Sequence, residues 1–132
     1  MQNTVTVKAL RIFVVEDEIL IRMLFEDMLE ELGHKVTCAA SLFDEALEMA
    51  RTCEVDAAIL DVRLAGIEVF PVAAILAERG IPFVFASGIA ETELPEPFRA
   101  RPMMRKPFRA RPMMRKPFEI ERLRDVIAQL AG

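Results

Sequence analysis

The chain lacks tryptophan and tyrosine, and it contains one histidine, His34. A single imidazole excludes zinc sites built on several histidines, and it argues against histidine-based catalysis. We expect His34, which follows Gly33, to be a solvent-exposed cap at a helix end. Cysteine occurs twice, at Cys38 and Cys53, with no spacing typical of a metal or redox motif, so we expect two buried thiols. No apolar run approaches the roughly 20 residues of a membrane helix, so we expect no membrane partner.

What the chain does contain is typical of one globular domain. It has 132 residues, of which 53% are hydrophobic and 29% charged, and this suffices for one sizeable core. The first residues lack the charged-then-apolar order of a signal peptide, so we expect a cytoplasmic protein. The formal net charge is −4, but the charges are unevenly distributed along the chain.

Residues 98–117 contain the sequence FRARPMMRKP twice without a change, and Phe118 stands where a third copy would begin. The two copies hold no acidic residue and eight basic ones, namely Arg99, Arg101, Arg105, Lys106, Arg109, Arg111, Arg115 and Lys116. The rest of the chain carries nine basic and twenty-one acidic residues. A basic strip can bind nucleic acid or an acidic protein face. Because phenylalanine is its only aromatic residue, the strip offers few platforms for stacking bases, which argues against nucleic acid.

Short apolar segments alternate with segments of helical periodicity. We predict strands at residues 11–15, 35–40, 56–62 and 81–87 and in the PMM of one repeat copy, with helices between them and a last helix at 118–130. Pro95 and Pro97 argue against a long helix between the fourth and fifth strands. Because strands and helices alternate, we expect an α/β fold with a doubly wound parallel sheet and helices on both faces.

Polar side chains follow the strands at the carboxyl edge of the predicted sheet, which is where such sheets bind ligands. They are Glu16 and Asp17 after the first strand, Asp61 at the third, Ser87 at the fourth, and Lys106 or Lys116 after the fifth. Carboxylates that share one edge repel one another unless a cation holds them, and Mg²⁺ prefers such oxygen ligands. A lysine and a hydroxyl on the other side suit the oxygens of a phosphoryl group.

The segments VVEDE, AAILDV and RKPF resemble the receiver domain of two-component response regulators over residues 10–131. The resemblance implies a flavodoxin-like, five-stranded sheet of order 2-1-3-4-5. FASG at residues 85–88 resembles the Phe-Ala-Thr-Gly motif of a subgroup of receivers in alphaproteobacteria. Members of that subgroup are often free-standing, and their fourth helix is short or missing. Serine in place of threonine keeps the hydroxyl group of the motif.

The resemblance also implies a role for each residue at the carboxyl edge. Asp61 would accept a phosphoryl group from the phosphohistidine of a sensor histidine kinase or a histidine phosphotransferase. Asp17, Asp61 and the backbone carbonyl of Arg63 would hold Mg²⁺, with Glu16 acting through water. Ser87 and the lysine would bind the phosphoryl oxygens. The side chain of Arg63 would either shield or orient attacking water or be an ordinary exposed loop residue.

The expected function is that of a stand-alone response regulator, which is no enzyme beyond its own phosphorylation and dephosphorylation. We expect no DNA-binding or catalytic segment after Gly132, and hence a single domain, monomeric or dimeric, that signals by contact with an unidentified downstream protein. One alternative is a receiver-like interaction module that no longer switches. Many receivers have a switching aromatic three residues before the lysine, where this chain has Met103 or Met113. Another alternative, an enzyme of the haloacid dehalogenase type, needs a second acid where this chain has Arg63.

The identical copies leave open which one forms the fifth strand, because their side-chain contacts are the same. Use of the first copy inserts ten residues before the last helix, and use of the second lengthens a connection that is already long. Loop closure costs roughly 1.3 kcal/mol in the first case and roughly 0.5 kcal/mol in the second. We therefore expect Lys116, rather than Lys106, to bind the phosphoryl group. The displaced copy could also permit strand exchange between two chains.

Overall fold

The computed structural model describes residues 8–87, 96–98, 101, 103–105 and 116–131, with the backbone alone described at 87, 103–105 and 116–119. The elements in chain order are β1 (Arg11–Val15), α1 (Ile19–Glu31), β2 (Lys35–Ala40), α2 (Phe43–Thr52), β3 (Ala57–Leu60), β4 (Arg63–Leu64), β5 (Ile67–Glu68), α3 (Phe70–Glu78), β6 (Phe83–Ser87), the 3-10 helix η2 (Glu96–Phe98), β7 (Met103–Arg105) and α4 (Lys116–Ala131). No helix in this part of the chain is both long and apolar enough to cross a membrane.

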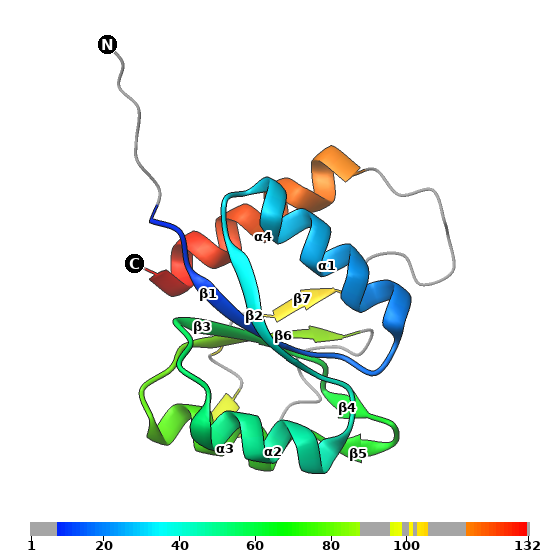
Figure 1. Cartoon of the computed structure of the whole chain (residues 1–132), viewed down its shortest axis with the longest axis vertical. Coiled ribbons are helices and arrows are strands. Elements are labelled where there is room, and N and C mark those ends of the chain that lie inside the picture. The colour runs from blue at the N-terminus through cyan, green and yellow to red at the C-terminus, as the bar shows by residue number, and fades with distance from the viewer. Residues whose placement is uncertain (1–7, 88–95, 99–100, 102, 106–115, 132) are drawn as a thin grey trace.

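Five parallel strands form one sheet in the order β2-β1-β3-β6-β7. When the small β4–β5 hairpin is left out of the count, this is the predicted order 2-1-3-4-5, so the α/β, doubly wound fold is confirmed. Figure 1 shows α1 and α4 on one face of the sheet and α2 and α3 on the other. Between β6 and β7 the described residues include the short helix η2. Residues 88–95 lie outside the described residues, so a short or missing fourth helix stays a prediction.

Alternate residues of β1 show why the sheet is apolar on both faces. Phe13 and Val15 lie in the core beneath α2 and α3, and Ile12 and Val14 lie in the core beneath α1 and α4. Each of these side chains is at most 1% exposed. Burial of one such side chain contributes roughly 1.5–3 kcal/mol. Because apolar side chains fill both faces, the polar side chains of the central strands are confined to the strand ends.

The fifth strand of the sheet, β7, comes from the first copy of the repeat. It pairs in parallel with β6, with Arg105 opposite Ser87. The end of the second copy lies in the first turn of α4, which begins at Lys116. The expectation that the second copy forms this strand was therefore wrong. It rested on a loop-closure difference below about 1 kcal/mol, which a single local contact can outweigh.

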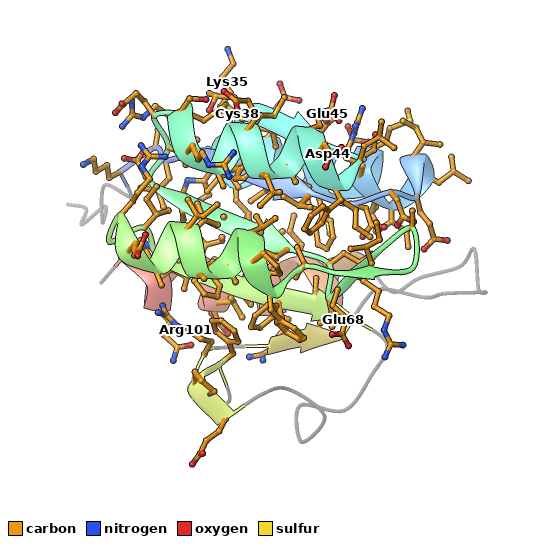
Figure 2. All side chains as sticks on the ribbon, turned by 90° about the horizontal axis from the view of Figure 1, so that it is seen from below. Lys35, Cys38, Asp44, Glu45, Glu68 and Arg101 are labelled. Carbon is orange, nitrogen blue, oxygen red and sulfur yellow. A yellow bond between two sulfur atoms is a disulfide. The ribbon has the colours of Figure 1, made fainter. Side chains whose placement is uncertain are left out.

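Side chains that lie just before β7 in the sequence make contacts that favour the first copy. The ring of Phe98 stacks on Phe70 at a centroid distance of 5.5 Å, and the guanidinium of Arg101 lies 4.3 Å above the ring of Phe83. Contacts of these two kinds each contribute roughly 0.5–1.5 kcal/mol. Although the copies are identical, the residues before them differ, because the first copy follows Glu96 and Pro97 and the second follows Lys106 and Pro107. Arg101 is labelled in Figure 2.

The turn after α1 buries the histidine. Gly33, with a φ of +91°, ends the helix in a Schellman turn, in which the N–H of His34 donates to the carbonyl of Leu29 at 2.8 Å. His34 is 7% exposed, and its Nδ1 accepts the N–H of Leu10 at 3.1 Å. The expectation of a solvent-exposed cap was wrong, because the Schellman turn directs the chain back toward β2.

The two cysteines are bonded to each other. Cys38 of β2 and Cys53, at the C-terminal cap of α2, form a disulfide, so the expectation of two buried thiols was wrong. Their spacing carried no signal of the bond, because β2 and the end of α2 come together only in the folded chain.

Candidate functional site

Three carboxylates lie where β1 and β3 end. Glu16 and Asp17 directly follow β1, and Asp61 directly follows β3. The N–H of Asp61 donates to the carbonyl of Val15 at 2.9 Å, and the N–H of Glu16 donates to the carbonyl of Ala40 at 3.0 Å. The hydrogen bonding of the sheet thus continues into the site. Parallel pairing of β1 with β3 brings together acids that are far apart in the sequence.

One oxygen from each of Glu16, Asp17 and Asp61 lies within 4.8 Å of the other two. Glu16 is 1% exposed and Asp61 is 5% exposed, whereas Asp17 is open to solvent. Carboxylates at this spacing repel one another where water is scarce, and a divalent cation removes the repulsion. Mg²⁺ takes few carboxylates and keeps several waters, which suits a buried acid pair with one open side. The donor set therefore fits the predicted metal.

Backbone hydrogen bonds orient two of these carboxylates. Oε2 of Glu16 accepts the N–H of Glu18 at 3.0 Å, at the N-terminal cap of α1. Oδ2 of Asp17 accepts the N–H of Ala65 at 3.0 Å. Because Ala65 lies between β4 and β5, Asp17 links the end of β1 to the segment that follows Asp61.

That segment is a tight hairpin, which was not predicted from the sequence. Arg63 of β4 lies opposite Glu68 of β5, and the two turn residues between the strands, Ala65 and Gly66, have positive φ values of 51° and 86°. Two positive φ values indicate a type I′ turn, whose usual sequence signal is Asn-Gly or Asp-Gly. Alanine in the first turn position removes that signal. The hairpin positions the N–H that binds Asp17, so it is part of the site.

The side chain of Arg63 points along the hairpin surface. Its guanidinium lies 3.9 Å from the carboxylate of Glu68, and both side chains are 58% exposed. Glu68 is labelled at the surface in Figure 2. Of the two interpretations of this side chain, the geometry favours an exposed residue. The role of its backbone carbonyl as a metal ligand stays a prediction.

Ser87 ends β6, which is the neighbour of β3 in the sheet, so its backbone lies at the same edge as the acids. Its side chain and the whole of Lys106 lie outside the described residues, and the roles predicted for them stay predictions. Lys106 directly follows β7 in the sequence, whereas Lys116 lies in the first turn of α4. The order of elements therefore favours Lys106 as the lysine at this edge.

Exposed apolar side chains also gather around this edge. Among the described residues, the large hydrophobic side chains open to solvent are Ile19, Leu20, Met23, Leu42 and Ile67. They lie at the start of α1, just before α2 and in β5, and each of these places follows the carboxyl end of a strand. Exposed apolar side chains that border a polar site are typical of a protein-binding surface.

The response regulator receiver domain family matches residues 12–128. The chain is 34% identical over 92 residues to the transcriptional regulatory protein PdtaR of Mycobacterium tuberculosis. This match covers 69% of the chain and 44% of PdtaR, so the chain spans less than half the length of this relative.

Solved structures share the fold described above. SdrG from Pseudomonas melonis Fr1, in its BeF3-activated conformation, is 38% identical, with a TM-score of 0.72 over 96% of this chain and 100% of that chain. The response regulator PhyR from Brucella abortus is 29% identical, with a TM-score of 0.73 over 94% of this chain and 48% of PhyR.

Proposed function

Because this chain belongs to the response regulator receiver domain family, we propose that Asp61 accepts a phosphoryl group from a sensor histidine kinase or a histidine phosphotransferase in a Mg²⁺-dependent reaction. The main support for this proposal is that one carboxylate oxygen from each of Glu16, Asp17 and Asp61 lies within 4.8 Å of the other two at the carboxyl edge of the sheet. A buried acid at this edge, beside two further acids, is suited to take up a phosphoryl group once the negative charge is neutralised.

The transfer uses Asp61 as the nucleophile. A carboxylate oxygen attacks phosphorus, the P–N bond to the donor histidine breaks, and the imidazole leaves with the electron pair and takes up a proton. Asp61 is 5% exposed, so little water competes as the nucleophile. Bound Mg²⁺ supplies neutralising charge to the carboxylates and the phosphoryl oxygens. Asp17 and Glu16 would hold the ion, and the N–H of Ala65 fixes the orientation of Asp17.

Ser87 and a lysine complete the site in this proposal. The hydroxyl of Ser87 donates to a phosphoryl oxygen, and the ammonium group pairs with another. We assign the lysine to Lys106, because it follows Arg105, which lies opposite Ser87 in the sheet. Binding at both residues would shift β6 and β7 together, and such a shift can carry the signal to a neighbouring surface.

The phosphoryl donor and the downstream target are both proteins in this proposal. The apolar side chains at the start of α1, just before α2 and in β5 support a protein donor, because a small phosphodonor needs no such surface. We assign residues 10–131 to the receiver domain and propose that it signals by contact with another protein in the cytoplasm.

A second candidate function is a receiver-like interaction module that no longer switches. The observation that favours it is the duplication, because ten residues, 106–115, separate β7 from α4 in the sequence. In such a module Asp61 stays unmodified and the chain acts by binding alone.

Intact-mass measurement after incubation with Mg²⁺ and acetyl phosphate distinguishes the two functions. We expect one added phosphoryl group on the wild type and none on Asp61→Asn, because an amide is not a nucleophile. Asp44→Asn, an exposed change in the first turn of α2, is the matched control and should keep the added mass. A folded wild type that stays unmodified would support the interaction module. Full modification of Asp61→Asn would overturn the assignment of the acceptor.

A further inference from the structure

The disulfide joins an edge strand of the sheet to the end of the helix that covers it. Cys38 lies in β2, which among the described strands pairs only with β1, and Cys53 caps the C-terminus of α2. Figure 2 shows Cys38 beside α2, near the outside of the molecule. The two Cα atoms are 6.8 Å apart, and the chain contains no other cysteine. Any thiol chemistry of this protein therefore belongs to this pair.

A β-bulge immediately precedes Cys38. In the pairing of β1 with β2, Ile12 lies opposite Val36, but the next residue, Phe13, lies opposite Cys38. Thr37 is thus an extra residue in β2 without a partner position in β1. Bulges of this kind bend a strand and change the direction in which the following side chains point.

The bulge turns Cys38 toward its partner. In a regular strand, residues two apart share a face, so Cys38 would lie with Val36. Instead, Val36 packs in the core beneath α1 and α4, and Cys38 packs in the core beneath α2 and α3. The extra residue Thr37 has therefore moved Cys38 to the face of the sheet on which α2 ends with Cys53.

We propose that Cys38 and Cys53 form a reversible thiol–disulfide site whose exchange partners are low-molecular-weight thiols and disulfides. Both side chains are half-buried rather than buried. In the described sheet no strand covers the outer edge of β2. In this proposal a small reagent reaches the sulfur atoms from this side of the sheet.

The exchange balances through a mixed disulfide. A thiolate of the reduced pair attacks one sulfur of a small disulfide such as glutathione disulfide, and one glutathione thiolate leaves. The second protein thiolate attacks the protein sulfur of the mixed disulfide, which closes the Cys38–Cys53 bond and releases the second glutathione. The protein loses two electrons and two protons, and glutathione disulfide becomes two thiols. Excess reduced glutathione drives the same steps in reverse.

The bond also lies close to the acid cluster. Two residues after Cys38, the carbonyl of Ala40 accepts the N–H of Glu16 at 3.0 Å. With the bond closed, α2 restrains this end of β2, and with the bond open that restraint is lost. The redox state of the pair is thereby transmitted to Glu16, a step that rests on the proposed function of the acids.

Alkylation followed by intact-mass measurement tests the thiol–disulfide site on the full chain. Across buffers of varied glutathione to glutathione disulfide ratio, we expect no alkyl group on the oxidised protein and two on the reduced protein, with both forms present between these limits. Thiols that remain open to alkylation in glutathione disulfide would overturn the proposal. A bond that excess reduced glutathione fails to open would overturn it as well.

Serine variants test the pairing. With glutathione disulfide, Cys38→Ser and Cys53→Ser should each form a mixed disulfide with one glutathione and go no further, and the double variant should bind none. Oxidised wild type should melt roughly 5–15 °C above the reduced form, because the bond restricts the unfolded chain. The double variant should melt at the same temperature as the reduced wild type, whether or not a reductant is present. A disulfide between two chains on a non-reducing gel would contradict the intramolecular bond.

Mg²⁺ binding by the oxidised and reduced proteins tests the effect on Glu16. We expect about twofold or greater weakening of Mg²⁺ affinity on reduction, measured by calorimetry. Equal affinity in the two forms would refute the transmission to Glu16. Absence of Mg²⁺ binding in both forms, together with reversible glutathione exchange, would instead count against the proposed function of the acids.

Discussion

Burial lowers the pKa of His34 below its ordinary value, because the charged imidazolium would lose its hydration inside the protein. Protonation at Nδ1 would also break the hydrogen bond from the N–H of Leu10. The folded state therefore favours the neutral ring. With a folded pKa below the unfolded value of about 6.5, this stabilisation is fully present above that value and is lost as the pH falls from there through the folded pKa.

We therefore expect the free energy of unfolding to fall as the pH drops below about 6.5, and we expect His34→Asn to reduce this dependence. The Oδ1 atom of asparagine can accept the same N–H without titrating in this range. Denaturant unfolding of both proteins at a series of pH values measures the effect. An equally steep decline in His34→Asn would assign the pH dependence to other groups.

The acid cluster predicts stabilisation by Mg²⁺ at neutral pH. A ligand that binds only the folded state contributes about 1.4 kcal/mol at ten times its dissociation constant, so millimolar Mg²⁺ should raise the melting temperature. Asp17→Asn should lose most of the increase, and Asp44→Asn should keep it. The test is the melting temperature of the wild type and of the two variants, measured with and without Mg²⁺. An undiminished increase in Asp17→Asn would place the ion at another site.

Among the secondary-structure elements, the β4–β5 hairpin supports the site most directly, because the N–H of Ala65 donates a hydrogen bond to the carboxylate of Asp17. Gly66 has a φ of +86°, and no atom lies within 4 Å of the place that a Cβ would take. Gly66→Ala should lower the free energy of unfolding by roughly 1 kcal/mol through backbone conformation alone. Ala65→Gly, at a φ of +51°, should be neutral or stabilising. Denaturant unfolding compares the variants, and equal losses in both would contradict this explanation.

The identical copies of the repeat permit a matched comparison. Phe98 packs against Phe70 and Phe85, with centroid distances of 5.5 and 5.8 Å. Phe98→Ala should lower the free energy of unfolding by roughly 2 kcal/mol or more. Phe108→Ala, the same change in the second copy, should lower it less. Chemical denaturation measures both, and equal losses would mean that the two copies exchange as the fifth strand.

Most elements could be predicted, because a strand buried on both faces leaves a continuous apolar run such as AAIL. The acids could be predicted as a group, because parallel strands place their carboxyl ends at one edge. The β4–β5 turn could not, since Ala65 does not favour a positive φ. The pairing of Cys38 with Cys53 depends on the bulge at Thr37, which has no sequence signature. Which repeat copy forms β7 could not be predicted either, because it depends on the contacts of Phe98 and Arg101 and not on loop length alone.

For the molecule as a whole, deletion of one copy gives the same sequence whichever copy is removed. The shortened chain should keep its sheet and gain roughly 1 kcal/mol in the free energy of unfolding, because ten fewer residues have to be closed into a loop between the sheet and the last helix. Denaturant unfolding of the two chains measures the difference. A less stable shortened chain would show that the additional copy makes stabilising contacts.

The two edges of the sheet are β2 and β7. An open edge presents a row of N–H and C=O groups onto which a strand of another molecule can add, and this is a common first step of aggregation. Thr37 interrupts the regular spacing of that row in β2, and β7 is three residues long. Both edges are therefore poor templates for strand addition, and the protein should stay dispersed at concentrations at which a long, flat edge would precipitate.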